Sequence, residues 1–262
     1  RAQELCYQAF DTHGRRRVQL AREAIHVCPD CADAYVILAE QAGTLEAEME
    51  HYTQAMAAAE RALGPEAMEE HVGHFWGVSS TRPYMRARFG VAQCLEQAER
   101  LDEAVDHYEE LLRLNPGDNQ GVRHVLLPKL LQLGRDVEAA RLLKQYDEAS
   151  AHWDYSRALL AFRLSGKSAA ARRELRTALR ANSHVPELLL GDAPLPMPPH
   201  YSPGSPEEAI VCAEELRGAF AETEGALSWL AAEHRRRQKK AAARDKELRR
   251  KQRGQKRKPK GR

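Results

Sequence analysis

The sequence has few of the residues from which β-sheets are built. Aromatic residues make up 6% of its 262 positions, and runs of four or more β-branched residues are absent. Alanine, leucine, glutamate and arginine dominate instead, and these are among the strongest helix formers. We therefore expect an all-α protein.

Long apolar segments are also missing. No apolar run comes near the roughly 18 residues that a membrane-spanning helix needs, and no secretory signal peptide is recognisable. We expect no membrane span in this sequence and a cytoplasmic location, or a nuclear one if the source is eukaryotic. The first residue is Arg1 rather than methionine, which leaves room for preceding sequence.

Patterns typical of catalysis are absent as well. The eleven histidines are scattered, and neither an H-E-x-x-H nor a G-x-S-x-G motif nor a paired acidic motif occurs. His71 and His74 have the i, i+3 spacing of metal ligands but no third ligand at a suitable distance along the chain. We expect no enzyme, no cofactor, no metal and no small-molecule substrate.

The five cysteines form an odd set in a chain without export signals, which favours free thiols. Cys28 and Cys31 have the C-x-x-C spacing of redox and zinc motifs, but no second ligand pair or strand-turn-helix pattern accompanies them. We interpret Cys-Pro-Asp-Cys as the end of one helix and the start of the next, with Asp30 as the N-cap.

Ala161 to Ser168, AFRLSGKS, fits a phosphate-binding loop if alanine is allowed at its first position. A phosphate-binding loop follows a buried strand, whereas here the preceding Tyr155, Ala158, Leu159 and Phe162 form a helical stripe. We therefore predict a corner between two helices, capped by Ser168, and no nucleotide binding.

Internal repeats are the dominant pattern. Small or apolar residues recur at the spacing i, i+4, i+7, with an earlier echo at Ala21 and Ala24. The triplets are Ala55/Ala59/Ala62, Ala104/Tyr108/Leu111, Ala139/Leu143/Tyr146 and Ala171/Leu175/Ala178. Their separations scatter around the roughly 34 residues of a tetratricopeptide repeat (TPR), except for one interval that is about 15 residues longer. This predicts about five helical pairs.

The best copy starts at Arg86, where Val91, Ala92 and Leu95 form the stripe of a first helix and Asn115-Pro116 ends the second. It resembles the TPR family, which implies an α-solenoid. The longer interval, about residues 64–83, is predicted to be an irregular insertion whose Phe75 and Trp76 plug a joint between repeats. Its exposed part is a second candidate for partner binding.

The sequence after the last predicted pair carries a narrower resemblance. A proline-rich crossing from Pro194 to Pro206 separates a short helix from a helical hairpin that ends near Trp229. The segments concerned are Asn182, His184-Val185-Pro186, Leu188-Leu189, Glu208-Ala209-Ile210 and Glu224-Gly225-Ala226-Leu227. They resemble the suppressor-of-tumorigenicity-seven family of TPR-like proteins over about residues 85–232. The resemblance implies the fold and no established catalytic activity; membrane-spanning N-terminal segments of animal members have no counterpart here.

These patterns predict three regions: a repeat array over 1–190, the proline-rich crossing and hairpin over 191–233, and a basic tail over 234–262.

The first helices of stacked pairs would line a concave surface. In this sequence that surface would contain Arg86, Phe89, Gln93, Arg123 and Trp153. Two guanidiniums beside aromatic rings suit a partner peptide or helix with carboxylates and an apolar anchor, and we expect their truncation to cost little fold stability. The alternative is that they are ordinary solvated residues. The main hypothesis is a non-catalytic scaffold or adaptor for protein partners.

The basic tail supports a second hypothesis. It holds 16 Lys and Arg against Asp245 and Glu247, whereas residues 1–233 hold 24 Lys and Arg against 36 acidic residues. The cations singled out are Arg235, Arg236, Arg237, Lys239, Lys240, Arg249, Arg250 and Lys251. The first half of the tail can extend a helix from Trp229, and the composition of GQKRKPKGR favours disorder. Without aromatic residues for base stacking, the tail would bind RNA, DNA or an acidic protein by charge alone, or would only solubilise this end.

Overall fold

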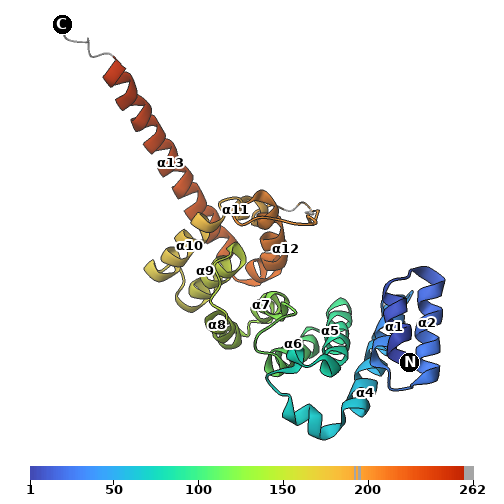
Figure 1. Cartoon of the computed structure of the whole chain (residues 1–262). Helices are drawn as coiled ribbons and strands as arrows, with labels where there is room; N and C mark the ends of the chain where they lie inside the picture. The colour runs from blue at the N-terminus through green and yellow to red at the C-terminus, as the bar shows by residue number, and fades with distance from the viewer. Residues whose placement is uncertain (192, 194–195, 257–262) are drawn as a thin grey trace. The chain divides into compact units, whose positions relative to one another are not determined.

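The computed structural model describes residues 1–262 except 192, 194–195 and 257–262, and it leaves the side chains of 245 and 247–256 undescribed. The described residues form thirteen α-helices and two short 3-10 helices, without a strand (Figure 1). The predicted all-α class is therefore confirmed. The chain divides into two compact units, Arg1–Leu133 and Gly134–Arg262. The three regions 1–190, 191–233 and 234–262 remain a prediction.

The first unit consists of seven α-helices and both 3-10 helices. They are α1 (Ala2–Phe10), α2 (Gly14–Val27), α3 (Ala32–Ala39), α4 (Leu45–Glu70), η1 (Phe75–Gly77), η2 (Ser79–Thr81), α5 (Arg82–Gln97), α6 (Leu101–Leu114) and α7 (Val122–Gln132). From α1 to α7 each helix except the pair α4 and α5 follows its neighbour after a short turn, and each packs against the next. In addition, α1 packs on α3 and α3 on α5, as in stacked helical pairs. A TPR-type superhelix remains a prediction.

A close approach of the Tyr52 ring of α4 to the backbone of α5 at Gly90 brings these two helices together. A Cβ atom on Gly90 would lie 2.4 Å from the ring of Tyr52, so only glycine leaves room for this buried ring. The core helices bury the predicted stripe of Val91, Ala92 and Leu95. The predicted triplets are also buried, except that Ala62 is exposed and Tyr146 is half-buried.

The predicted insertion at 64–83 is more helical than expected. Gly64 has a φ of 73° and kinks α4 before Pro65, but the helix continues to Glu70. Beyond it, η1 and η2 lead into α5, and Thr81 donates a hydrogen bond to the carbonyl of Phe75. Phe75 is fully buried with its ring edge against Tyr84, the centroids 6.0 Å apart. Phe75 therefore packs within the unit.

The second unit contains the six remaining helices. They are α8 (Asp136–Gln145), α9 (Ala151–Ser165), α10 (Ala169–Ala181), α11 (Val185–Leu189), α12 (Pro206–Glu222) and α13 (Ala226–Lys256). The corner between α9 and α10 confirms the helical interpretation of AFRLSGKS: Gly166 has a φ of 57° and the Ser168 hydroxyl accepts the N–H of Ala171 at 3.1 Å. The Cys-Pro-Asp-Cys turn also joins two helices, but the N-cap of α3 is Cys31 and not Asp30, which forms an ion pair with Arg61.

The motif residues of the C-terminal region form a buried polar network. The Glu208 carboxylate accepts hydrogen bonds from the backbone N–H groups of Ala151 (3.2 Å) and Gly204 (2.6 Å) and from the Asn182 amide (3.0 Å). The Tyr155 hydroxyl donates to the carbonyl of Asn182 at 2.8 Å. One carboxylate therefore connects α9, the end of α10 and the start of α12.

The second helix of the predicted hairpin and the first part of the predicted tail form one helix. Gly225, with a φ of 77°, makes the turn between α12 and α13, and Trp229 stacks on Phe162 with centroids 4.7 Å apart. From there α13 runs without interruption to Lys256, and in Figure 1 its C-terminal half extends beyond the other helices of its unit. Most of the segment GQKRKPKGR lies outside the described residues.

Candidate functional site

The two arginines of the predicted repeat groove bind carboxylates of their own unit. Arg86 of α5 forms an ion pair with Asp33 of α3, which is 3% exposed and also accepts a hydrogen bond from Gln3 at 2.9 Å. Arg123 pairs at 2.8 Å with Asp118, whose carboxylate also accepts the N–H of Val122 and so begins α7. Because each arginine neutralises a buried carboxylate, we expect its truncation to cost fold stability, in contrast to the expectation from the sequence.

The remaining residues of the predicted groove are divided between the two units. Phe89 is half-buried with its ring edge against Tyr108, the centroids 5.7 Å apart, and Gln93 is exposed on the same helix. Trp153 is fully buried in the second unit. In the loop, Trp76 is half-buried beneath the guanidinium of Arg82, which lies 5.6 Å from the ring centroid. That these residues bind a partner remains a prediction.

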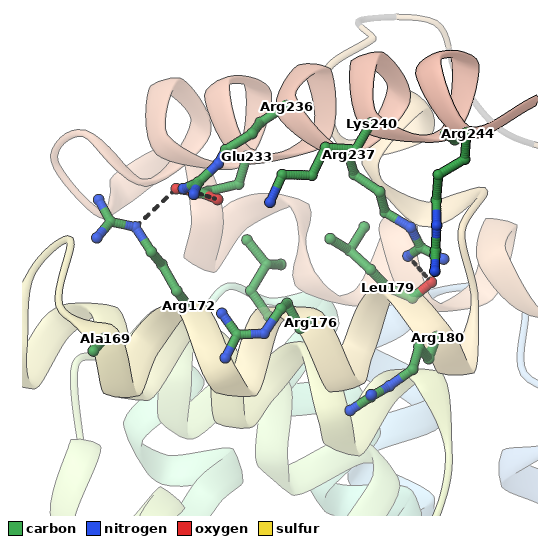
Figure 2. A pocket seen from close by; sticks show the side chains of 12 residues that line it. Ala169, Arg172, Arg176, Leu179, Arg180, Glu233, Arg236, Arg237, Lys240 and Arg244 are labelled. Carbon is green, nitrogen blue, oxygen red and sulfur yellow. Dashed lines mark hydrogen bonds and ion pairs between the residues drawn. The ribbon is translucent and has the colours of Figure 1, made fainter. Parts of the chain in front are cut away.

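A basic groove lies between α10 and α13 in the second unit (Figure 2). We call it the α10–α13 groove; its volume is about 740 Å³. Its lining residues are Ala169, Arg172, Leu175, Arg176, Leu179, Arg180, Glu233, Arg236, Arg237, Lys240, Ala241 and Arg244. Seven of these are cations and one is acidic, while the leucines and alanines make the base partly apolar.

Helical periodicity explains the two basic walls. Arg172, Arg176 and Arg180 recur every four residues on α10, and Arg236, Lys240 and Arg244 recur in the same way on α13. Residues four apart share one helix face and are separated by about 6 Å along the axis. The walls therefore present two rows of positive charge, as Figure 2 shows for the side chains of both helices.

Some of this charge is used to hold the walls together. Arg172 forms an ion pair with Glu233 at 2.9 Å, and Arg236 lies 3.6 Å from the same carboxylate. Arg237 donates to the carbonyl of Leu179 near the end of α10 (Figure 2). By contrast, no ion pair to any described residue engages Arg176, Lys240 or Arg244, and all three are exposed. An acidic ligand would meet these three cations first.

The α10–α13 groove partly overlaps with the predicted polyanion site. Arg236, Arg237 and Lys240 line the groove, whereas Arg235 and Lys239 are exposed on α13 outside its lining. The side chains of Arg249, Arg250 and Lys251 lie outside the described part. Sequence reasoning missed the wall on α10, although the four-residue spacing of its arginines in ARRELRTALR was a usable signal.

The described residues contain no group of three or more His, Cys, Asp and Glu side chains placed to hold a metal ion. Among the described helices, none combines the length and the apolar composition that crossing a membrane requires.

Known proteins share most of this chain. The family model described as ST7 protein matches residues 2–235, a longer region than the motifs had indicated. Proteins called "Suppressor of tumorigenicity 7 protein" from Macaca fascicularis and Mus musculus are each 31% identical over 233 residues and match 79% of this chain. The chain spans less than half of their length, 43% and 40% respectively. Neither description names a catalytic activity. The match confirms the family resemblance, and this chain belongs to the ST7 protein family.

Proposed function

We propose that this chain is a non-catalytic interaction protein that holds an acidic segment of a partner protein in the α10–α13 groove. The observation that carries the proposal is the pairing of two cationic walls over a partly apolar base with a single acidic residue, Glu233. Guanidiniums form strong, oriented hydrogen bonds to carboxylates, and the base offers contact area to apolar side chains.

The spacing of the walls suits a helical or extended segment with repeated carboxylates. A partner helix with glutamates four residues apart would place them about 6 Å apart, which matches the rise between Arg176 and Arg180 or between Lys240 and Arg244. Leucines on its other positions would meet the exposed Ala169 and Ala241, since Leu175 and Leu179 at the base are almost fully buried. The segment would thus be recognised by charge and by shape.

The alternative is a nucleic acid held by the cations of α13. A duplex is a rod with phosphates on its surface, so it would contact the exposed rim of α13 at least as well as the inside of a groove. Arg235 and Lys239 lie on that rim, outside the groove lining. Protein binding and nucleic-acid binding therefore depend on different cations.

A charge-reversal experiment separates the two. The groove variant is Arg176→Glu with Lys240→Glu, and its matched control is Arg173→Glu with Lys239→Glu, which makes the same charge change on the same helices outside the groove lining. The probe is a fluorescent amphipathic peptide with glutamates at every fourth position, titrated against the full chain at physiological salt. We expect the groove variant to lose about 2–4 kcal/mol of binding, at least tenfold in Kd, and the control to lose much less.

The same variants are also titrated with a short RNA duplex. If the groove variant and the control lose the same affinity for the duplex, and also the same affinity for the peptide, charge alone governs binding and the groove has no specific role. A failure of the full chain to bind the peptide at all would refute the proposed occupant.

A further inference from the structure

A pair of buried thiols lies in the first unit, beside a cavity that Asp33 and Arg86 also line. The sulfur of Cys6 on α1 lies 3.5 Å from the sulfur of Cys31, at the N-cap of α3. The two positions are 25 residues apart in the sequence, and no disulfide joins them in this structure. Sequence spacing had drawn attention to Cys28 with Cys31, whereas the fold places Cys6 against Cys31.

Cys31 is reachable from a cavity. It is 8% exposed, whereas Cys6 is completely buried. The cavity has a volume of about 670 Å³ and is lined by Cys31 together with residues of α1, α3, α4 and α5, among them Tyr7 and Phe10. A small uncharged oxidant could therefore meet the Cys31 sulfur first, with Cys6 directly behind it.

The surroundings make the two thiols chemically unequal. The pKa of Cys31 is lowered to about 7, first because the Cys6 thiol donates a hydrogen bond to its sulfur and also because of the nearby backbone N–H of Ala34. Burial and the negative charge of Asp33 act in the opposite direction, although Asp33 itself is paired with Arg86. The same hydrogen bond raises the pKa of Cys6. The thiolate is the reactive form of cysteine, and a position at the start of a helix favours it.

We propose that Cys31 is an oxidisable site and that Cys6 is its resolving partner, so that a small hydroperoxide converts the pair into a disulfide between α1 and α3. The Cys31 thiolate attacks one peroxide oxygen, and the S–O bond forms as the O–O bond breaks. The leaving oxygen takes up the proton that the Cys31 thiol released on ionising and departs as water or an alcohol. The Cys6 sulfur then attacks the Cys31 sulfenic acid. The S–S bond forms, the S–O bond breaks, and the proton of Cys6 leaves with the hydroxide as water. The two thiols lose two electrons, which the peroxide gains.

The geometry favours this pair over other combinations. Closing the bond brings sulfurs now in contact to about 2.05 Å, which is a smaller change than joining either sulfur to a remote cysteine. Cys94 and Cys212 are buried without a neighbouring thiol, and burial raises the pKa of the Cys94 thiol to about 12 and that of Cys212 as well. These two cysteines serve as unreactive references within the same chain.

The test treats the reduced full chain with graded hydrogen peroxide, removes the peroxide, blocks the remaining thiols with N-ethylmaleimide in denaturant and maps the peptides by mass spectrometry. Met197, which is 57% exposed, reports the oxidant dose through its sulfoxide. We expect a Cys6–Cys31 disulfide at doses that leave Cys94 and Cys212 blocked as thiols, and a rise in Tm that a reducing agent reverses, because the bond restricts the unfolded chain. Conversion of Met197 with Cys6 and Cys31 still reduced would overturn the proposal.

Variants test the roles of the two sulfurs. In Cys6→Ala the sulfenic acid of Cys31 should persist and be trapped by dimedone, whereas Cys31→Ala should give neither adduct nor disulfide. Cys28→Ser is the matched control, since Cys28 is three residues from Cys31 but is not its sulfur contact; it should form the disulfide at the rate of the parent chain. A disulfide that uses Cys28 in the parent chain, or links two molecules, would contradict the assignment. Mapping of the parent chain decides the question even if a variant does not fold.

Discussion

At the scale of single residues, pairing with a buried carboxylate decides whether an arginine is available to bind a partner. Asp33 is almost inaccessible and has two donors, Gln3 and Arg86. A buried charge that loses its counter-charge retains the cost of its removal from water. Arg86 therefore contributes to the stability of the first unit, whatever else it contacts.

We expect Arg86→Ala to lower the free energy of unfolding by about 1–3 kcal/mol, because the carboxylate of Asp33 loses its charged donor. Urea denaturation followed by circular dichroism measures the loss. Adding Asp33→Asn should recover much of it, since the buried charge is then gone. Arg113→Ala is the matched control, because Arg113 pairs with Glu110 at 2.6 Å on an exposed helix face. Equal losses in both single variants would show that burial of Asp33 does not matter.

The helices of the second unit are joined by a few polar contacts as well as by apolar packing. Glu208 on the first turn of α12 receives donors from α9, from the end of α10 and from the turn at Gly204. Arg163 of α9 acts in a similar way, since it donates to Thr223 at 2.8 Å and pairs with Asp136 of α8 at 2.7 Å. Such contacts fix the angles between elements, because each demands a specific position of its donors.

We expect Glu208→Gln to destabilise the second unit by about 1–3 kcal/mol, although its shape hardly changes. Glutamine replaces one acceptor oxygen by an NH₂ group, which would then face the donors of Ala151 or of Asn182 and Gly204. Glu207→Gln, on the exposed side of the same turn, is the control and should be close to neutral. Thermal melts monitored by the fluorescence of Trp153 and Trp229 can compare the two; indistinguishable melting would count against the network.

At the scale of the whole molecule, the two compact units carry different features. The first contains the thiol pair and the paired Arg86 and Arg123, and the second contains the α10–α13 groove. The family match ends at residue 235, so the α10 wall lies within it and the α13 wall mostly beyond it. A truncation after the groove residues therefore removes the charge of the tail and keeps the charge of the groove.

We expect a chain that ends at Arg244 to keep its affinity for the acidic peptide, because all the groove residues remain. Its affinity for duplex RNA should fall and depend less steeply on salt, since the cations of residues 246–262 are gone and each lost phosphate contact reduces the log-log slope by about 0.9. Titrations of both ligands at several salt concentrations measure this. Parallel loss of both ligands would assign the peptide to the tail instead of the groove.

The sequence alone determined the helices, their buried stripes and the corner at Gly166-Lys167-Ser168, because helical periodicity and capping act over a few residues. The motif residues of the C-terminal region were also recognisable in the sequence, but not that Glu208 accepts hydrogen bonds from Asn182, Gly204 and Ala151. Tertiary structure alone decided which side chains meet. It paired Arg86 with Asp33, placed Cys6 rather than Cys28 against Cys31, and set the arginines of α10 opposite those of α13. These contacts join residues 25 to 61 positions apart, and local propensity carries no information about the packing that brings them together.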